Sequence, residues 1–168
     1  MKTKDLNEEQ LLDYFKEHIR YEVLMLLNAT HAIIGKFQVP KGLEYMAVES
    51  YAIHLRNLIN FFYPPNKIRD TDVCAKDFFI EEATWSKERP ELSITLKGAR
   101  ERADKEVSHL TTLRKYANDN DKKWDIKPLA CEIIQVFDLF CKYADKVELV
   151  SLVDDLKNHY SLIKSLEN

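Results

Sequence analysis

Hydrophobic residues recur every three or four positions along most of the chain, the spacing that places side chains on one face of an α-helix. Over residues 8–34 the stripe consists of Leu12, Phe15, Ile19, Val23, Leu26, Thr30 and Ile33. Asn7 has the side chain of a helix N-cap, and Gly35 is a residue type that commonly ends a helix. The pattern therefore predicts a first long amphipathic helix over 8–34.

The same periodicity predicts further helices over 43–63 and 90–117, and from about 126 onward. The segment 43–63 stops at Pro64-Pro65, because proline cannot continue the backbone hydrogen bonding of a helix. The segment 90–117 begins with a proline, which is tolerated in the first turn. Two apolar stripes follow residue 126, and their spacing leaves open whether residues 126–166 form one helix or two.

Residues 64–89 are predicted to form a long connection, with one short helix in the stretch "DVCAKDFF". A connection of this length in a compact protein is usually functional or packed by its own side chains. Phe78, Phe79 and Trp85 are the side chains suited to that packing.

No strand-like alternation and no internal repeat competes with the helical pattern, and the chain holds only three glycines. Each amphipathic helix must bury its apolar stripe against the others. We therefore expect an all-α protein, an up-and-down bundle of four to five long helices, with residues 1–168 forming a single domain.

The composition of the chain argues against several classes of function. The net charge of −3 gives no overall basic field of the kind that attracts nucleic acid. Cys74, Cys131 and Cys141 form no C-x-x-C pair, which is typical of reduced thiols in a cytosolic protein. The amino-terminal residues lack an apolar signal core. We expect a soluble cytoplasmic protein without a membrane partner. The chain carries no glycine-rich phosphate loop, nucleophile elbow or zinc spacing.

The candidate chemistry lies in "RERADKEVSHLTTLR", late in the segment 90–117. At 100° per residue, Arg102, Glu106 and His109 form a stripe roughly 100° from the centre of the apolar face. Arg102 and His109 point almost the same way, since seven residues are about two helical turns. Residues 97–115 hold six Lys or Arg against three Asp or Glu, so this helix is locally basic.

Three interpretations remain open for this stripe. It is an ordinary charged flank with a salt bridge between Arg102 and Glu106. Alternatively, Glu106-x-x-His109 is one element of a metal site, with His18, Glu22 and Glu49 as further ligand candidates, although no second E-x-x-H is present. In the third interpretation, Arg102 holds a phosphate group while His109 moves a proton.

Residues 43–63 carry a second polar face, formed by Glu49, Arg56 and Asn60. Glu49 and Arg56 are candidates to position the segment 90–117 or to join its site. The alternative is a buried polar network that fixes how the helices align.

The arrangement resembles the HEPN superfamily, in which long bundled helices carry an arginine and a histidine near the end of a late helix. The stretches "KEVSHLTTLR" and "ESYAIHLRNLINFFY" also resemble parts of uncharacterised bacterial proteins of this kind. The resemblance implies a homodimer that cleaves RNA without a metal or other cofactor, in a toxin–antitoxin or other defence system. It implies acid–base catalysis by His109 and charge stabilisation by Arg102. From their positions on the helix faces, Glu106, Glu49 and Arg56 are the expected supporting residues.

One departure keeps an alternative function open. In active members the residue after the arginine is usually polar, and here it is Ala103. The alternative is a non-catalytic helical module that binds a protein partner or a nucleotide. The resemblance also allows for an antitoxin as a protein partner.

Overall fold

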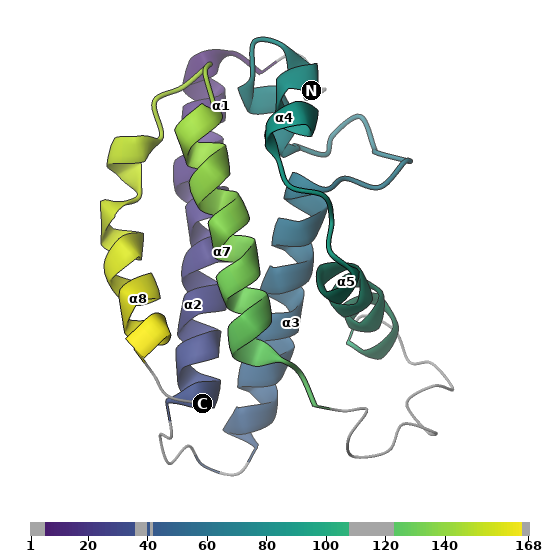
Figure 1. The fold of residues 1–168 in the computed structure, drawn as a ribbon, viewed down its shortest axis with the longest axis vertical. Helices are drawn as coiled ribbons and strands as arrows, with labels where there is room; N and C mark the ends of the chain where they lie inside the picture. Colours follow the sequence, from purple (N-terminus) through teal and green to yellow (C-terminus); the bar gives the residue numbers. More distant parts are fainter. Residues whose placement is uncertain (1–5, 36–39, 41, 108–122, 166–168) are drawn as a thin grey trace.

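The computed structural model describes residues 6–35, 40, 42–107 and 123–165. This part of the chain consists of helices and connecting loops, without a strand, and it confirms the predicted all-α bundle (Figure 1). Three long helices lie side by side, and shorter helices cover their sides and one end.

The predicted helix over 8–34 is confirmed, with a change of helix type inside it. It comprises α1 (Glu8–Tyr14), the π-helical turn η2 (Phe15–Ile19) and α2 (Arg20–Ile34). Asn7 caps it as expected: its side chain accepts a hydrogen bond from the backbone of Gln10 at 2.9 Å, and the Gln10 side chain accepts one from the backbone of Asn7 at 3.0 Å.

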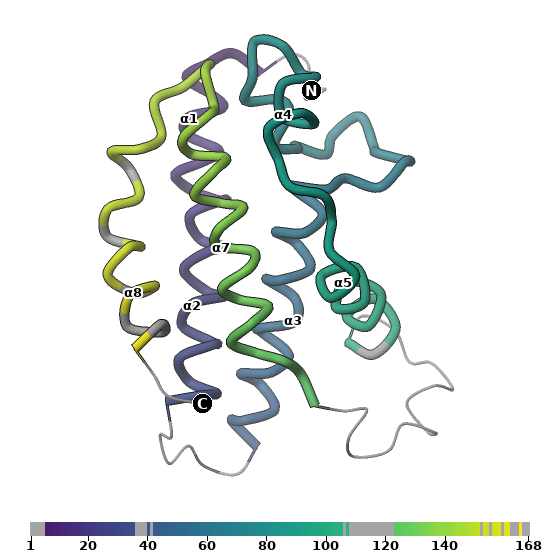
Figure 2. The backbone as a smooth tube through the Cα atoms, viewed as in Figure 1, coloured from purple at the N-terminus to yellow at the C-terminus, as the bar shows by residue number. Residues whose placement is uncertain are grey.

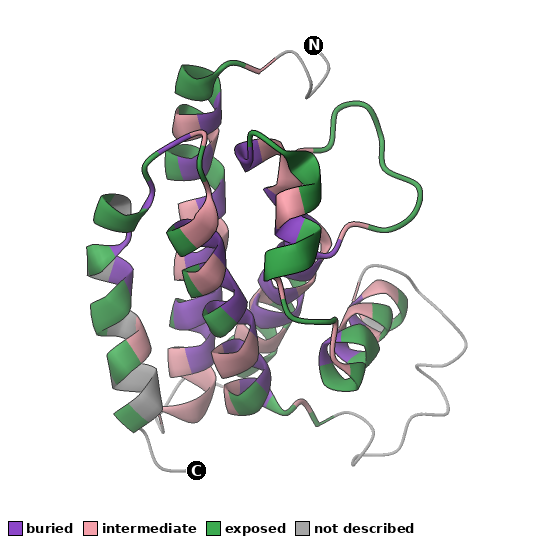
Figure 3. Cartoon of the chain, turned by 45° about the horizontal axis from the view of Figure 1, so that its top comes forward, coloured by how far each residue is buried: buried purple, intermediate pink, exposed green. Residues whose placement is uncertain are grey.

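Helix α3 (Leu43–Phe62) returns antiparallel to α2, and α7 (Ile126–Tyr143) packs against both (Figure 1). Their facing surfaces are apolar, as Figure 3 shows by the buried residues along the inner sides of these helices. Phe140 of α7 is fully buried and lies within 5.3–6.4 Å, between ring centroids, of the following aromatic rings: Phe15, Phe61, Phe62, Phe78, Phe79 and Trp85. This cluster ties the long helices to the connection that follows α3.

The connection after α3 contains the 3-10 turn η3 (Ala75–Phe78) and the short helix α4 (Glu82–Glu88). The expected packing is confirmed, because Phe78, Phe79 and Trp85 are all buried. The Trp85 indole N–H donates to the carbonyl of Phe62 at 2.9 Å, which satisfies a carbonyl at the end of α3.

Helix α5 (Ile94–Glu106) lies against α3 and runs across the direction of the long helices (Figure 2). The predicted start at Pro90 is wrong, because residues 90–93 are not helical. Ser93 is the N-cap, and its hydroxyl accepts from the backbone of Leu96 at 3.0 Å. A serine that satisfies a free backbone N–H is a stronger start signal than a proline that is only tolerated. Residues 108–117 of the predicted helix lie outside the described part.

The start of the last helical segment at Ile126 is confirmed, and the described residues beyond it form two helices. Helix α7 ends at Tyr143, and α8 (Asp154–Ser165) follows a 3-10 turn η4 (Val150–Leu152). Lys146 holds the intervening loop against η3 through two hydrogen bonds. Its backbone N–H donates to the carbonyl of Phe78, and its ammonium group donates to the carbonyl of Asp77. Helix α8 packs on α2 and α7.

The described helices show no segment that is both long and apolar enough to cross a bilayer.

A candidate ligand-binding groove beside α2 and α3

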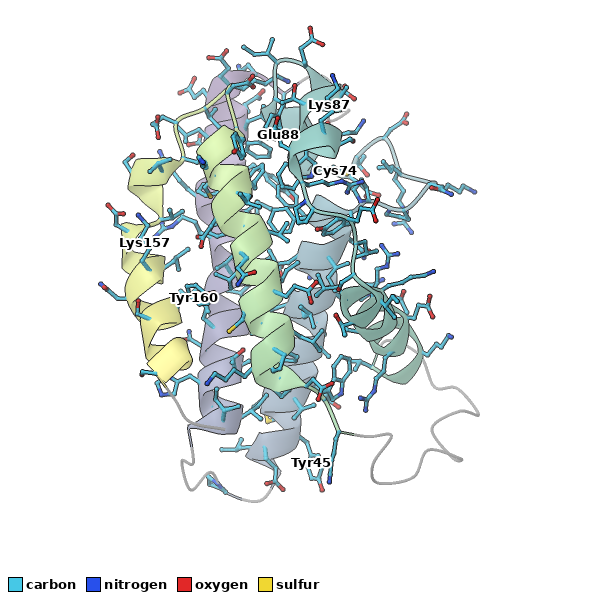
Figure 4. All side chains as sticks on the ribbon, viewed as in Figure 1. Tyr45, Cys74, Lys87, Glu88, Lys157 and Tyr160 are labelled. Atoms are coloured by element: carbon cyan, nitrogen blue, oxygen red, sulfur yellow. The ribbon has the colours of Figure 1, made fainter. Side chains whose placement is uncertain are left out.

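A polar groove of about 630 Å³ lies where η2 and α2 pass the C-terminal half of α3 and residues 64–74. Its walls include Tyr14, His18, Glu22, Asn57 and Asn60. Cys74, labelled in Figure 4 below α4, also lines it. Small-molecule sites usually have volumes of about 300–1,000 Å³ with a few fixed polar groups. The groove therefore has the size and the polarity of a ligand site.

Glu22 is the most firmly held polar group in the groove wall. Its Oε2 accepts hydrogen bonds from His54 Nδ1 at 2.7 Å and from Asn57 Nδ2 at 3.1 Å. His54 is largely buried, and the edge of its ring meets the Tyr21 ring with centroids 5.6 Å apart. A carboxylate fixed by two donors from the neighbouring helix presents its remaining acceptor capacity in a set direction.

The π-helical turn places His18 and Tyr14 beside Glu22. The His18 ring lies on Tyr14, with ring centroids 4.7 Å apart. Burial raises the pKa of Tyr14, and the nearby charge of Glu22 raises it further. The Tyr14 hydroxyl therefore stays protonated at neutral pH and can donate or accept a hydrogen bond. Single π-helical turns are frequent at functional sites, because they re-aim the side chains of a helix.

Several donors in the groove wall are unused within the described part of the chain. The side chains of Asn60, Lys67 and Arg69 form no hydrogen bond or ion pair there. Asn60 is half-buried, whereas Lys67 and Arg69 are exposed on the loop after α3. The groove thus combines the fixed carboxylate of Glu22, the carboxylate of Asp72, the amide of Asn60 and two exposed cations.

Arg56 lines the same groove and also contacts α5. Its guanidinium Nε donates to the Asp104 carboxylate, which joins α3 to α5. This contact links α3 to α5, and the supporting role of Arg56 beside Arg102 and His109 stays a prediction. Its side chain remains about one-third exposed, at 34%. The remaining guanidinium donors can therefore face a ligand in the groove.

Arg102 lies apart from this groove, on α5 near the start of α7. Its Nη1 donates to the carbonyl of Lys123 at 2.5 Å, and its guanidinium carbon lies 4.4 Å from the ring centroid of Trp124. A cation over an indole face is attracted by the negative charge of the ring. Arg102 therefore holds the chain that leads into α7.

The structure describes the other residues expected from the sequence only in part. Glu49 is exposed on α3. Glu106 closes α5, but its side chain and the whole of His109 lie outside the described residues. Among the residues that are described, no group of three or more His, Cys, Asp or Glu is arranged to hold a metal ion.

Sequence reasoning did not assemble the contact between Glu22, His54 and Asn57. The sequence does place both polar residues at the edge of the core: Glu22 borders the apolar stripe of the first helix, and His54 is next to the buried Leu55. A polar residue at the edge of a core stripe needs a partner when it is buried. The identity of that partner depends on how α2 and α3 align, which no local pattern specifies.

A scan against protein-family models finds no matching family, and searches of curated proteins and of solved structures find no match.

Proposed function

We propose that this chain is a helical binding module whose groove beside α2 and α3 takes a nucleotide. The observation that carries the proposal is the Glu22 carboxylate, held by His54 and Asn57 in the wall of a 630 Å³ groove. Groups fixed before binding lose little conformational entropy when a ligand arrives. They also set its orientation.

The chemistry of the groove suits the parts of a nucleotide. Carboxylate and amide groups such as Glu22 and Asn60 match the amino groups and ring nitrogens of a base or the hydroxyls of a ribose. Lys67 and Arg69 supply positive charge for the phosphate. Tyr14 offers an aromatic face of the kind on which bases stack.

Calorimetric titration with AMP, GMP, CMP and UMP tests this proposal. We expect at least one to bind, and Asn60→Ala to weaken that binding about 2–13-fold, the loss for one hydrogen bond of 0.5–1.5 kcal/mol. The matched control is Asn28→Ala, because Asn28 is exposed on α2 and does not line the groove. No binding at millimolar nucleotide, or equal weakening by both variants, would contradict the proposal and leave a protein partner as the ligand.

A second candidate function is metal-independent RNA cleavage by a HEPN-like homodimer, with Arg102 and His109 as the acting pair. The observation in its favour is the position of Arg102, half-buried near the end of α5 and four residues before Glu106. In this proposal Glu106, Glu49 and Arg56 support the pair, and an antitoxin or other protein partner regulates it. The contacts of Arg102 with Lys123 and Trp124 favour the binding module instead.

An RNA cleavage assay with EDTA present distinguishes the binding module from the ribonuclease. The ribonuclease proposal expects the wild type to cleave and His109→Ala to lose about 10²–10⁴ in rate, the usual contribution of general acid–base catalysis. Light scattering should then show a dimer. A monomer that leaves RNA intact would eliminate this candidate.

A further inference from the structure

A second pocket, of about 460 Å³, lies on the other side of Pro64-Pro65 from the groove. It is formed where the end of α3 meets the end of α4 and the first half of α5. Two arginines line it, Arg89 from the residue after α4 and Arg100 from α5. Ser86, Asn66 and Glu91 complete its polar lining.

Both arginines are fixed by the carbonyls that end α3. Arg89 Nη1 donates to the carbonyl of Phe62 at 2.6 Å, and Arg100 Nη1 donates to that of Tyr63 at 3.0 Å. The guanidinium carbon of Arg89 also lies 4.7 Å from the centroid of the Tyr63 ring. Each guanidinium carries five N–H donors, so these contacts leave several donors free on each side chain.

Charges of both signs lie near this pair, because Glu132, like Arg89, acts electrostatically on Tyr63. Within the described residues neither guanidinium is paired with a carboxylate. The helix end that they cap contributes only about half a negative charge. Glu91 lines the pocket but is exposed and outside ion-pair distance of both. Two guanidinium groups that line one pocket, and that no carboxylate pairs with in the described part of the chain, leave donors for an anion.

Tyr63 also lines this pocket. The residue is only 4% exposed, and its hydroxyl is buried with no hydrogen-bond partner in the described part of the chain. A buried hydroxyl without a partner is costly, and an ordered water commonly supplies one.

We propose that this pocket binds a small phosphate-bearing molecule, with Arg89 and Arg100 gripping the phosphate. A phosphate monoester carries about −1.5 to −2 charges at pH 7, which matches two guanidinium groups better than the single charge of a carboxylate does. The pocket is larger than a bare ion, so an organic portion of the ligand can rest on the prolines. This site is separate from the proposed nucleotide groove and does not depend on it.

The test is a titration of the full chain with inorganic phosphate at constant ionic strength, followed by thermal melting and calorimetry, with acetate as a second probe. We expect saturable binding of phosphate and at least tenfold weaker binding of acetate. Acetate that binds as tightly as phosphate, or phosphate that shows no saturable binding, would overturn the proposal.

Two variants assign the binding to this pocket without removing the capping arginines. Ser86→Glu places a negative charge in the lining and should weaken phosphate binding at least tenfold, whereas Glu91→Gln removes one and should tighten it severalfold. The control is Lys87→Gln, because Lys87 is exposed on α4 and outside the pocket (Figure 4). If Lys87→Gln weakens binding as much as Ser86→Glu does, the effect is a diffuse surface charge and the proposal fails.

The variants also keep the two sites distinguishable, since a nucleotide carries phosphate as well. Ser86→Glu should leave nucleotide binding in the groove unchanged, and Asn60→Ala should leave inorganic phosphate binding unchanged. Selective loss of phosphate binding in Ser86→Glu and of nucleotide binding in Asn60→Ala supports both sites. Loss of both ligands in one variant would show that they share a site.

Discussion

Replacing Glu22 with alanine tests whether the groove wall is held as described. The change removes the acceptor for His54 Nδ1 and Asn57 Nδ2, at 2.7 and 3.1 Å, while the side chains of Glu22 and His54 are only 22% and 11% exposed. A buried donor without a partner costs about 1–3 kcal/mol. Water reaches part of this site, so we expect the free energy of unfolding to fall by about 2–4 kcal/mol in total.

Urea unfolding of a double-mutant cycle measures the contact itself. Glu22→Ala, His54→Ala and the double variant should give a coupling free energy of roughly 0.5–3 kcal/mol, the range for residues in direct contact. Glu22→Gln keeps the shape and one acceptor oxygen, and should cost less than Glu22→Ala. The control is Glu17→Ala, because the Glu17 side chain is 74% exposed and its removal should change stability by less than about 0.5 kcal/mol. Zero coupling, or equal effects of Glu22→Ala and Glu17→Ala, would refute the description of the groove wall.

Three further predictions concern other parts of the molecule. Arg102→Ala removes a hydrogen bond and a cation–π contact, so the free energy of unfolding measured in urea should fall by about 1–2 kcal/mol. An unchanged free energy of unfolding would show that those contacts contribute nothing. Phe140→Ala should cost about 3–5 kcal/mol, as its ring is the centre of the aromatic cluster; a cost under 1 kcal/mol would contradict that position. Iodoacetamide at pH 8 should modify Cys131 before Cys74 and Cys141, as followed by peptide mass spectrometry. Cys74 and Cys141 are buried, and burial raises the pKa of Cys74 to about 11. The reverse order of modification would be inconsistent with the structure.

The helices themselves were readable from the sequence because their determinants are local. The stripe over 8–34, the cap at Asn7 and the stop before Pro64 depend on residues within a few positions of one another. The start of α5 was misread where two local rules compete, and the hydroxyl of Ser93 prevails over the tolerance for Pro90.

The break between α7 and α8 depends on distant contacts. Lys146 is held by the carbonyls of Asp77 and Phe78, from a turn far earlier in the chain. The two apolar stripes on either side of the break fit one helix or two equally well. Only the packing of η3 against this loop decides between them.

The groove could not be predicted from the sequence, because it also depends on contacts between residues far apart in the chain. Glu22 and His54 were visible as polar residues at the edge of a core, but their pairing requires the alignment of α2 with α3. Helical spacing alone predicts that Arg102 and His109 share a face, because that spacing is a local property of the sequence. The partners of Arg102, Lys123 and Trp124, come from beyond the end of its helix and could not be seen in that spacing.

The most direct test of the nucleotide groove is NMR of the side-chain amides during titration with the nucleoside monophosphate that binds most tightly. The binding module predicts saturable shifts of the Asn57 and Asn60 amide signals, since both line the groove. It predicts no shift for Asn28, which is exposed elsewhere on α2. Unshifted Asn57 and Asn60 signals at saturating nucleotide would contradict the account.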